Sequence, residues 1–497
     1  MNSSLPLINL LQSISEKHTE KTAFIINGAT FSYSEFYQKV TEIALELNAT
    51  SNQKKVLVIT NNDLETYASI IAIWLTGNTY IPINSNETEE RLRQALQIVN
   101  ADLVLVSKSI DNTYFDELKQ INTANLAPSN KSLPNIETNS NAIAYILFTS
   151  GTTGIPKGVP VSYQNLAAFV DSFLSLGYSF TPKDIFLQMA DLTFDMSIIA
   201  TLIPLCVGAT IVTIDEDEMK YLATYKALED QHISVLITAP STLQLLKPFY
   251  SEINLEQLNY TFVGAEAFYE TTAQQWQKCA PNSQIINLYG PSEGGILSTT
   301  YTWDKKTTNE YQGIVSIGKA VKNIDLHIVD QLGNLITDNQ EGEAWISGKQ
   351  VFDSYLDETM NTDKFGYLTL NGEKKKCFKT GDIVVRANEN LFYCGRKDEQ
   401  IKVQGKRIEL TEIEHYANQI TGKFKAKAIN FKAAFGTNQI ALFVDDKIDV
   451  VELSKHLEEH LPVYMLPSKI IGLTALPLNK NQKVDKQTLL TYLNNFT

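Results

Sequence analysis

The stretch Phe148-Thr149-Ser150-Gly151-Thr152-Thr153-Gly154-Ile155-Pro156-Lys157-Gly158 joins two apolar patterns of different period. Residues 142–148 have the continuous apolar character of a buried strand, and residues 165–176 have the amphipathic pattern of a helix. Glycine permits positive φ and close backbone approach, so successive N–H groups between these elements can converge on an anion. The hydroxyl groups add donors, and Lys157 adds a positive charge. The stretch therefore predicts a polyphosphate-binding loop, with an ordinary Gly/Ser/Thr turn as the alternative.

Length and charge predict more than one domain. The chain has 497 residues, which exceeds the size of a single hydrophobic core. Its net charge of −14 argues against nucleic-acid binding, because that binding needs clustered Lys and Arg. From Asp398 to the end there are 13 Lys and Arg against 12 Asp and Glu, whereas the first 397 residues have 29 against 44. This change predicts a large domain over 1–397 and a small domain over 398–497.

The cysteines, histidines and termini indicate a cytoplasmic protein without a structural metal. Four widely spaced cysteines contain no CxxC pair, which predicts reduced thiols. The six histidines suggest no ligand set, so no zinc site is expected. The N-terminus lacks the pattern of a signal peptide. The uncharged run Met196–Ile214 contains Pro204 and Gly208, and it predicts a helix and a buried strand instead of a membrane span.

Strand and helix patterns alternate over the first 290 residues. Alternation of this kind predicts an α/β fold with doubly wound, parallel sheets. Between residues 313 and 385 the pattern changes to short strands and turns, which predicts a β-rich subdomain. After Asp398 it becomes mixed and predicts a small α+β domain. The expected strands of the first region are 55–59, 79–83, 103–106, 210–214, 235–238, 260–263 and 284–288.

Three further polar stretches follow strands or lie in loops. In an open parallel sheet, ligands bind outside the carboxyl ends of the strands, where Tyr289 and Glu293 are expected. Tyr289 could stack on a base, and Glu293 could hold a magnesium ion. Asp382 is placed to accept both hydroxyls of a ribose, and Lys483 lies in a polar loop near the C-terminus. Taken singly, each is explained as well by a turn, a solvated carboxylate or an exposed lysine.

Taken together, these stretches resemble the adenylate-forming superfamily, which contains acyl-CoA synthetases, luciferases and the adenylation domains of nonribosomal peptide synthetases. The resemblance extends over nearly the full length, and the ten core motifs of that superfamily occur in their usual order. They are residues 31–36, 77–83, 148–158, 194–197, 287–293, 342–348, 380–382, 395–414, 461–467 and the segment around Lys483.

The resemblance implies ATP and Mg2+ as cofactors. Glu293 would coordinate the metal, and Lys483 would bridge the substrate carboxylate and the α-phosphate. Lys157 and Glu293 join Lys483 as the expected catalytic residues. Asp398 would be the hinge on which the small domain rotates, bringing Gly405 into the site. The residues expected to bind ATP are Thr149, Ser150, Gly151, Thr152, Thr153, Gly154, Lys157, Asn287, Tyr289, Ser292, Asp382 and Arg396.

The implied reaction fits these residue types. Attack of a carboxylate on the α-phosphate builds negative charge on oxygen, so fixed cations and dipoles provide most of the catalysis. A general base is not needed, because the carboxylate is already ionised. Two departures from the usual motifs are small: Ser292 stands where Thr is commoner, and Gln482 stands where Gly usually precedes the catalytic lysine.

Asp195 narrows the substrate class. In the superfamily, an aspartate after the phenylalanine of this motif marks enzymes that bind an α-amino group, and a buried carboxylate needs such a cation. A carboxylate that caps the following helix is the alternative. The pocket suggests a small or medium apolar amino acid, with D-alanine as a candidate. By the same resemblance, its wall consists of Met196, Ile199, Thr238, Thr261, Val263, Leu288, Ile296 and Leu297.

The expected acceptor is a phosphopantetheinylated carrier protein. The chain ends eleven residues after Lys486, so this carrier is expected to act in trans. D-Alanine–carrier protein ligases and free-standing amino-acid adenylation enzymes are the nearest expected classes. Lys423, Lys425 and Lys427 could form part of a docking face, although solvated lysines explain this run as well. An acyl- or aryl-CoA synthetase and an inactive nucleotide-binding homologue are the alternative functions.

We predict that Lys483→Ala abolishes adenylate formation and leaves the protein folded. The ammonium group is expected to contact both the attacking carboxylate and the α-phosphate, so its loss removes charge stabilisation from the transition state. Amino-acid-dependent ATP–pyrophosphate exchange measures the reaction, and circular dichroism measures the fold. Near-normal exchange in the variant would show that the C-terminal motif is misaligned.

Overall fold

The fold is known from a computed structural model of the 497-residue chain. The residues that it describes are 10–11, 17–48, 53–108, 115, 117–129, 131, 139–151, 156–215, 218–307, 309–337, 339–398, 400–421, 426–433, 436–479 and 484–495. Lys483 and residues 152–155 of the glycine-rich stretch lie outside them.

A six-stranded sheet has the order β6-β5-β3-β4-β7-β8. Neighbouring strands are parallel except for β7 and β8, which are antiparallel and are joined by the glycine-rich stretch. Strand β8 was not expected, because its Gly and Pro hide the strand pattern. The strands are β3 (Lys55–Thr60), β4 (Thr79–Asn84), β5 (Leu103–Val106), β6 (Lys119–Asn122), β7 (Ile143–Thr149) and β8 (Lys157–Ser162).

A nine-stranded sheet has the order β17-β14-β13-β12-β11-β9-β10-β1-β2. Its central strands are parallel, and antiparallel pairs occur at both edges. The strands are β1 (Thr22–Ile26), β2 (Ala29–Ser32), β9 (Ile185–Gln188), β10 (Thr210–Thr213), β11 (Val235–Thr238), β12 (Tyr260–Val263), β13 (Gln284–Tyr289), β14 (Thr299–Trp303) and β17 (Lys319–Ala320).

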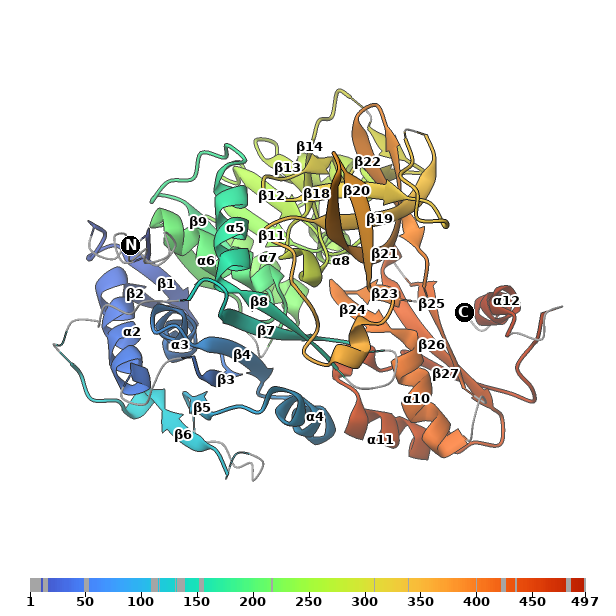
Figure 1. Ribbon diagram of the computed structural model, residues 1–497, viewed down its shortest axis with the longest axis horizontal. Coiled ribbons are helices and arrows are strands. Elements are labelled where there is room, and N and C mark those ends of the chain that lie inside the picture. Colours follow the sequence, from blue (N-terminus) through green and yellow to red (C-terminus); the bar gives the residue numbers. More distant parts are fainter. Residues whose placement is uncertain are drawn as a thin grey trace.

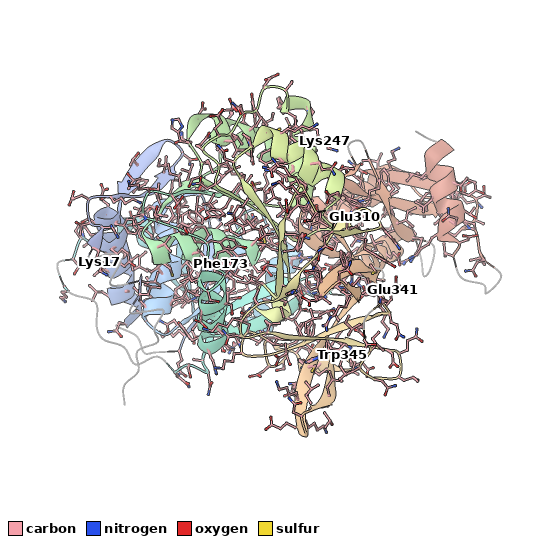
Figure 2. The ribbon with its side chains drawn as sticks, turned by 90° about the horizontal axis from the view of Figure 1, so that it is seen from above. Lys17, Phe173, Lys247, Glu310, Glu341 and Trp345 are labelled. Carbon is pink, nitrogen blue, oxygen red and sulfur yellow. The ribbon has the colours of Figure 1, made fainter. Side chains whose placement is uncertain are left out.

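Helices pack between and around these two sheets (Figure 1). The largest hydrophobic cluster joins both sheets through side chains such as Phe36, Ile71, Phe169 and Leu202. Figure 2 shows Phe173 near the middle of the molecule. The helices are α2 (Tyr33–Asn48), α3 (Leu64–Leu75), α4 (Glu89–Val99), α5 (Tyr163–Leu174), α6 (Met196–Val207), α7 (Lys220–Asp230), α8 (Pro240–Leu245) and α9 (Glu270–Cys279).

The uncharged run Met196–Ile214 forms α6 and β10, as predicted. Helix α6 ends at Gly208, whose φ of 73° suits a left-handed cap, and a Cβ there would lie 2.8 Å from His18. Among the described residues, no helix is long and apolar enough to cross a membrane.

A β-rich part follows, also as predicted. Its five-stranded sheet has the order β18-β19-β21-β20, with β22 paired to β21. Strands β15 (Glu310–Tyr311) and β16 (Ile314–Val315) form a short pair beside it. The strands of the larger sheet are β18 (Asp325–Val329), β19 (Glu341–Ser347), β20 (Phe365–Leu370), β21 (Glu373–Ala387) and β22 (Asn390–Arg396).

The C-terminal part has α+β structure and hydrophobic clusters of its own. Helix α12 packs on one face of its three-stranded sheet through Leu489 and Leu493. The α/β class with a large N-terminal part and a smaller C-terminal part is confirmed, and the boundary at residue 397 remains our proposal. The elements are β23 (Gln400–Val403), β24 (Lys406–Glu409), α10 (Leu410–Thr421), β25 (Lys427–Lys432), β26 (Asn438–Asp445), α11 (Val450–His460), β27 (Lys469–Leu473) and α12 (Lys486–Asn495).

A buried ion pair joins α4 of the large part to α10 of the small part. The Arg91 Nη1 atom lies 2.6 Å from Glu412 Oε1, and the two side chains are 6% and 0% exposed. Burial raises the pKa of Glu412 to about 7, and the Arg91 guanidinium opposes this shift. Next to the pair, Gln94 donates a hydrogen bond to the Tyr416 hydroxyl (3.2 Å).

We predict that Arg91→Ala weakens the contact between the two parts. The substitution leaves the Glu412 carboxylate buried without its cation, which costs about 3–5 kcal/mol in such pairs. The small part can escape this cost by moving away, so the radius of gyration from small-angle X-ray scattering should increase. Arg93→Ala is the matched control, because Arg93 lies on the same helix with a side chain that is 49% exposed. Equal scattering from both variants would contradict the prediction.

Candidate functional site

The site lies where the carboxyl ends of the parallel strands face the small part of the molecule. A cavity of about 180 Å³ opens beside β13, and we call it the β13 cavity. Asn287, Tyr289, Asp382 and Arg396 line it, so four of the residues expected to bind ATP come together here. Residues of the small part, including Lys402 and Asn430, complete the wall.

Asp382 is held by one residue on each carboxylate oxygen. The Tyr289 hydroxyl donates to Oδ2 (2.6 Å), and Arg396 Nη1 donates to Oδ1 (2.7 Å). Arg396 also binds both oxygens of Asp398, at 2.6 and 2.8 Å. The predicted hinge residue is therefore tied to the predicted ribose-binding residue through a single guanidinium group.

Glu293 is fully buried beside a cation. Its carboxylate accepts hydrogen bonds from Arg407 Nη1 (2.9 and 3.0 Å) and from the Tyr355 hydroxyl (2.5 Å). Burial would raise the pKa of Glu293, but Arg407 and Tyr355 outweigh it, and the pKa is lowered. The carboxylate is therefore ionised and able to bind a cation.

Lys157 faces a carboxylate from the same strand as Arg407. Its Nζ lies 3.7 Å from Glu409 Oε1, and both side chains are buried. Burial lowers the pKa of Lys157, and Glu409 opposes this effect. Nearby, the Ser150 hydroxyl donates to the Arg407 carbonyl (3.0 Å), and Thr149 Oγ1 is buried without a hydrogen-bond partner among the described residues.

Asp195 begins helix α6 and points into a second pocket, of about 60 Å³, which we call the Asp195 pocket. It makes no side-chain capping hydrogen bond to the helix, and its Oδ2 accepts from the Ser292 hydroxyl at 2.6 Å. Burial raises the pKa of Asp195, with the Ser292 hydrogen bond opposing. The predicted wall residues Met196, Ile199, Leu288 and Ile296 line this pocket.

Four other predicted wall residues do not line the Asp195 pocket. Thr238 lines a neighbouring pocket with Gly405 and Lys406, and Asp195 and Met196 line that pocket as well. Thr261 hydrogen-bonds Ser283 and Trp276. Val263 joins a hydrophobic cluster with Trp276, because residues 261 and 263 share one face of β12. Leu297 is fully buried in the largest cluster.

Two histidines come together, contrary to the expectation of no ligand set. Ligand atoms of His456, Glu459 and His460 on α11 lie within 4.8 Å of one another. Residues 456 and 460 are separated by about one helical turn and therefore share a face, a spacing that the sequence already contained.

The sequence did not single out the charged residues of the β23–β24 hairpin. Lys402, Arg407 and Glu409 reach the site although they follow the expected hinge. At the hairpin turn, Gly405 has a φ of 77°, and its N–H donates to Glu266 Oε1 (2.7 Å). The apolar Ile408 between the charged Arg407 and Glu409 was the signal that could have indicated this face.

Comparison with known proteins relates this geometry to a family. A family model described as AMP-binding enzyme matches residues 11–356. Tyrocidine synthase 3 of Brevibacillus parabrevis is 29% identical over 97% of this chain, which corresponds to 8% of the length of that protein. The D-alanine–D-alanyl carrier protein ligase of Bacillus licheniformis is 26% identical over 98% of this chain and 99% of its own length.

A solved structure supports the fold. The adenylation domain AlmE of Vibrio cholerae, in complex with glycyl-adenosine-5'-phosphate, superposes with a TM-score of 0.88 at 23% identity. The match covers 100% of this chain and 99% of the AlmE chain.

We predict that Tyr289→Phe lowers the free energy of unfolding by about 1–3 kcal/mol, because it removes a donor from a buried carboxylate. Urea unfolding followed by tryptophan fluorescence measures the change. Tyr367→Phe is the control, since Tyr367 is 58% exposed. If the two variants unfold at the same urea concentration, the Tyr289–Asp382 hydrogen bond does not contribute to stability.

Proposed function

The chain belongs to the family of AMP-binding enzymes, and on this premise we propose that it activates an amino acid for a carrier protein. Members of this family form an acyl adenylate from ATP. The proposed reaction joins a small or medium apolar amino acid, with D-alanine as a candidate, to AMP and releases pyrophosphate. The aminoacyl group then passes to the phosphopantetheine thiol of a separate carrier protein.

Asp195 is the observation that carries this proposal. Its carboxylate is buried in the Asp195 pocket, where burial raises its pKa and a neutral hydroxyl, Ser292, is hydrogen-bonded to it. Lys402 of the small part also lines this pocket, and its charge opposes the rise in the pKa of Asp195. An ammonium group is the partner that favours the ionised form of such a carboxylate. The absence of a capping hydrogen bond argues against the alternative that Asp195 serves only the helix.

The size of the Asp195 pocket supports a small side chain. A Cβ added at Gly264 would lie 3.2 Å from Leu288 Cβ and 3.6 Å from Met196 Cε, so this wall is already closely packed. Ile199, Ile296 and Phe194 add further apolar surface to the pocket. Alanine or a residue of similar size suits this space better than an aromatic amino acid.

Nucleotide and metal are assigned to the residues around Glu293. In the proposal, Tyr289 and Asn287 contact the base, Asp382 and Arg396 the ribose, and Lys157 the distal phosphates together with residues 149–154. Glu293 would hold Mg2+, which neutralises phosphate charge when bound. The position accepts a cation, because the Arg407 guanidinium already occupies it in this arrangement.

The arrangement of the two parts suits the second step of the reaction. Arg407 engages Glu293 and Glu409 engages Lys157, so the groups assigned to the metal and distal phosphates are already paired. Gly405 stands beside Ala239 and Ala265, next to the pocket that Thr238 lines. We assign this pocket to the thiol arm. The thiol would lose its proton to solvent, and the resulting thiolate would attack the aminoacyl carbonyl carbon. The bond from that carbon to the phosphate oxygen would break, and AMP would leave.

Three of the proposed residues are supported by the sequence alone. Lys483 lies outside the described residues, and its role as the adenylating lysine is still a prediction. Lys423 and Lys425 also lie outside them, whereas Lys427 forms an ion pair with Glu414 (2.9 Å).

The test is ATP–pyrophosphate exchange with D- and L-amino acids and with organic acids that lack an amino group. We expect exchange with a small apolar amino acid, and a loss of about 100-fold or more in kcat/KM for Asp195→Ala, since a buried charge pair is broken. Asp171→Ala, at a side chain that is 51% exposed, is the matched control and should retain exchange.

Each alternative function has its own outcome. Exchange only with acids that lack the amino group, followed by transfer to CoA, would favour an acyl- or aryl-CoA synthetase. Binding of ATP without exchange for any acid would favour an inactive homologue. In either case the assignment of Asp195 to an α-amino group would be wrong.

A further inference from the structure

The small part of the molecule contributes an unpaired acceptor to the β13 cavity. Asn430 lies on β25, and its side chain lines the cavity together with Asn287 and Tyr289. Its Oδ1 atom is buried and has no hydrogen-bond partner among the residues that the structure describes. A buried carbonyl oxygen without a donor is costly, so a ligand that supplies one would be favoured at this position.

A chain of amides fixes the direction in which this oxygen points. The Lys402 backbone carbonyl can only accept, and Asn438 Nδ2 donates to it at 2.7 Å. Asn438 therefore turns its oxygen to Asn430, whose Nδ2 donates to it at 3.3 Å. The remaining atom of the Asn430 amide is its oxygen, so exchange of O and N at this residue would break the chain.

A second acceptor comes from the large part. Asn287 Nδ2 donates to the backbone carbonyls of Val315 (3.3 Å) and Ser316 (2.9 Å), which leaves its side-chain oxygen as an acceptor. Asn287 and Asn430 thus bring one amide oxygen each to the same cavity, from different parts of the molecule. Two acceptors match the two hydrogens of an aromatic amino group and oppose the carbonyl oxygen that guanine carries at the corresponding position.

We propose that Asn430 accepts a hydrogen bond from the 6-amino group of adenine when the small part occupies this arrangement. The inference rests on the proposed function, which places the base beside Tyr289 in the β13 cavity. The ligand is AMP or the aminoacyl adenylate, because Glu409 and Arg407 already pair with Lys157 and Glu293. The small part therefore contacts the base of the bound adenylate directly and distinguishes adenine from bases that lack the amino group.

This contact links nucleotide binding to the position of the small part. A ligand shifts an equilibrium between two arrangements only through its different affinity for them. An adenine amino group that reaches Asn430 in one arrangement provides such a difference. By reciprocity, the arrangement seen here binds AMP more tightly than an arrangement in which β25 has moved away.

Titration calorimetry with AMP and with purine riboside 5'-monophosphate, which lacks the 6-amino group, tests the proposal. In the wild type, AMP should bind more tightly than the analogue. Asn430→Leu should weaken AMP about fivefold to tenfold, as loss of one hydrogen bond implies, and leave the affinity for the analogue unchanged. Asn430→Ala provides a second, smaller replacement, and circular dichroism checks that both variants fold. Asn254→Leu, at an exposed position outside the cavity, should retain the wild-type preference.

Equal losses for both nucleotides, or no loss for either, would overturn the proposal. Its failure is distinguishable from failure of the proposed function, which is measured by pyrophosphate exchange in the wild type. If the wild type catalyses pyrophosphate exchange but replacement of Asn430 affects both nucleotides equally, only this inference is overturned. Discrimination without amino-acid-dependent exchange would overturn the proposed function and retain the base contact.

Discussion

The site depends on the need of one buried carboxylate, Glu293, for a cation. It is fully buried and therefore requires positive charge nearby, and Arg407 of the small part supplies it. The same requirement holds for Lys157 with the opposite sign, and Glu409 meets it. Glu293 and Lys157 of the large part are thus buried charges that need a partner of opposite sign. That partner is either a residue of the small part or a charged ligand.

Strand geometry explains how one hairpin serves both charges. Arg407 and Glu409 are two residues apart on β24, so their side chains lie on the same face, toward the large part. Ile408 lies on the opposite face and is fully buried in the hydrophobic cluster of the small part. Burial of Ile408 fixes the orientation of β24, and this orientation directs the Arg407 and Glu409 side chains toward the large part. Apolar packing in the small part therefore contributes to the register of this hairpin.

Local patterns in the sequence predicted the alternating sheets and the helix and strand within Met196–Ile214, whereas the family resemblance identified the residues that meet around Asp382. They failed where a contact joins distant segments. Arg91 and Glu412 are 321 residues apart, and each is an ordinary charge within an amphipathic helix. Strand β8 was missed because Gly158 and Pro160 obscure its pattern. Thr261 and Val263 were expected on the pocket wall, but they face Ser283 and Trp276. Only the alternation of side chains along β12 could have indicated this face.

The contacts of the hairpin also have a kinetic meaning on the proposed cycle. If the small part must withdraw so that ATP can enter, the pairs at Glu293, Lys157 and Glu266 are broken and remade in every turnover. Their combined strength then sets how long the closed arrangement persists. Stronger contacts between the hairpin and the large part would prolong the closed arrangement in which the thiol reacts, but they would also delay release of AMP.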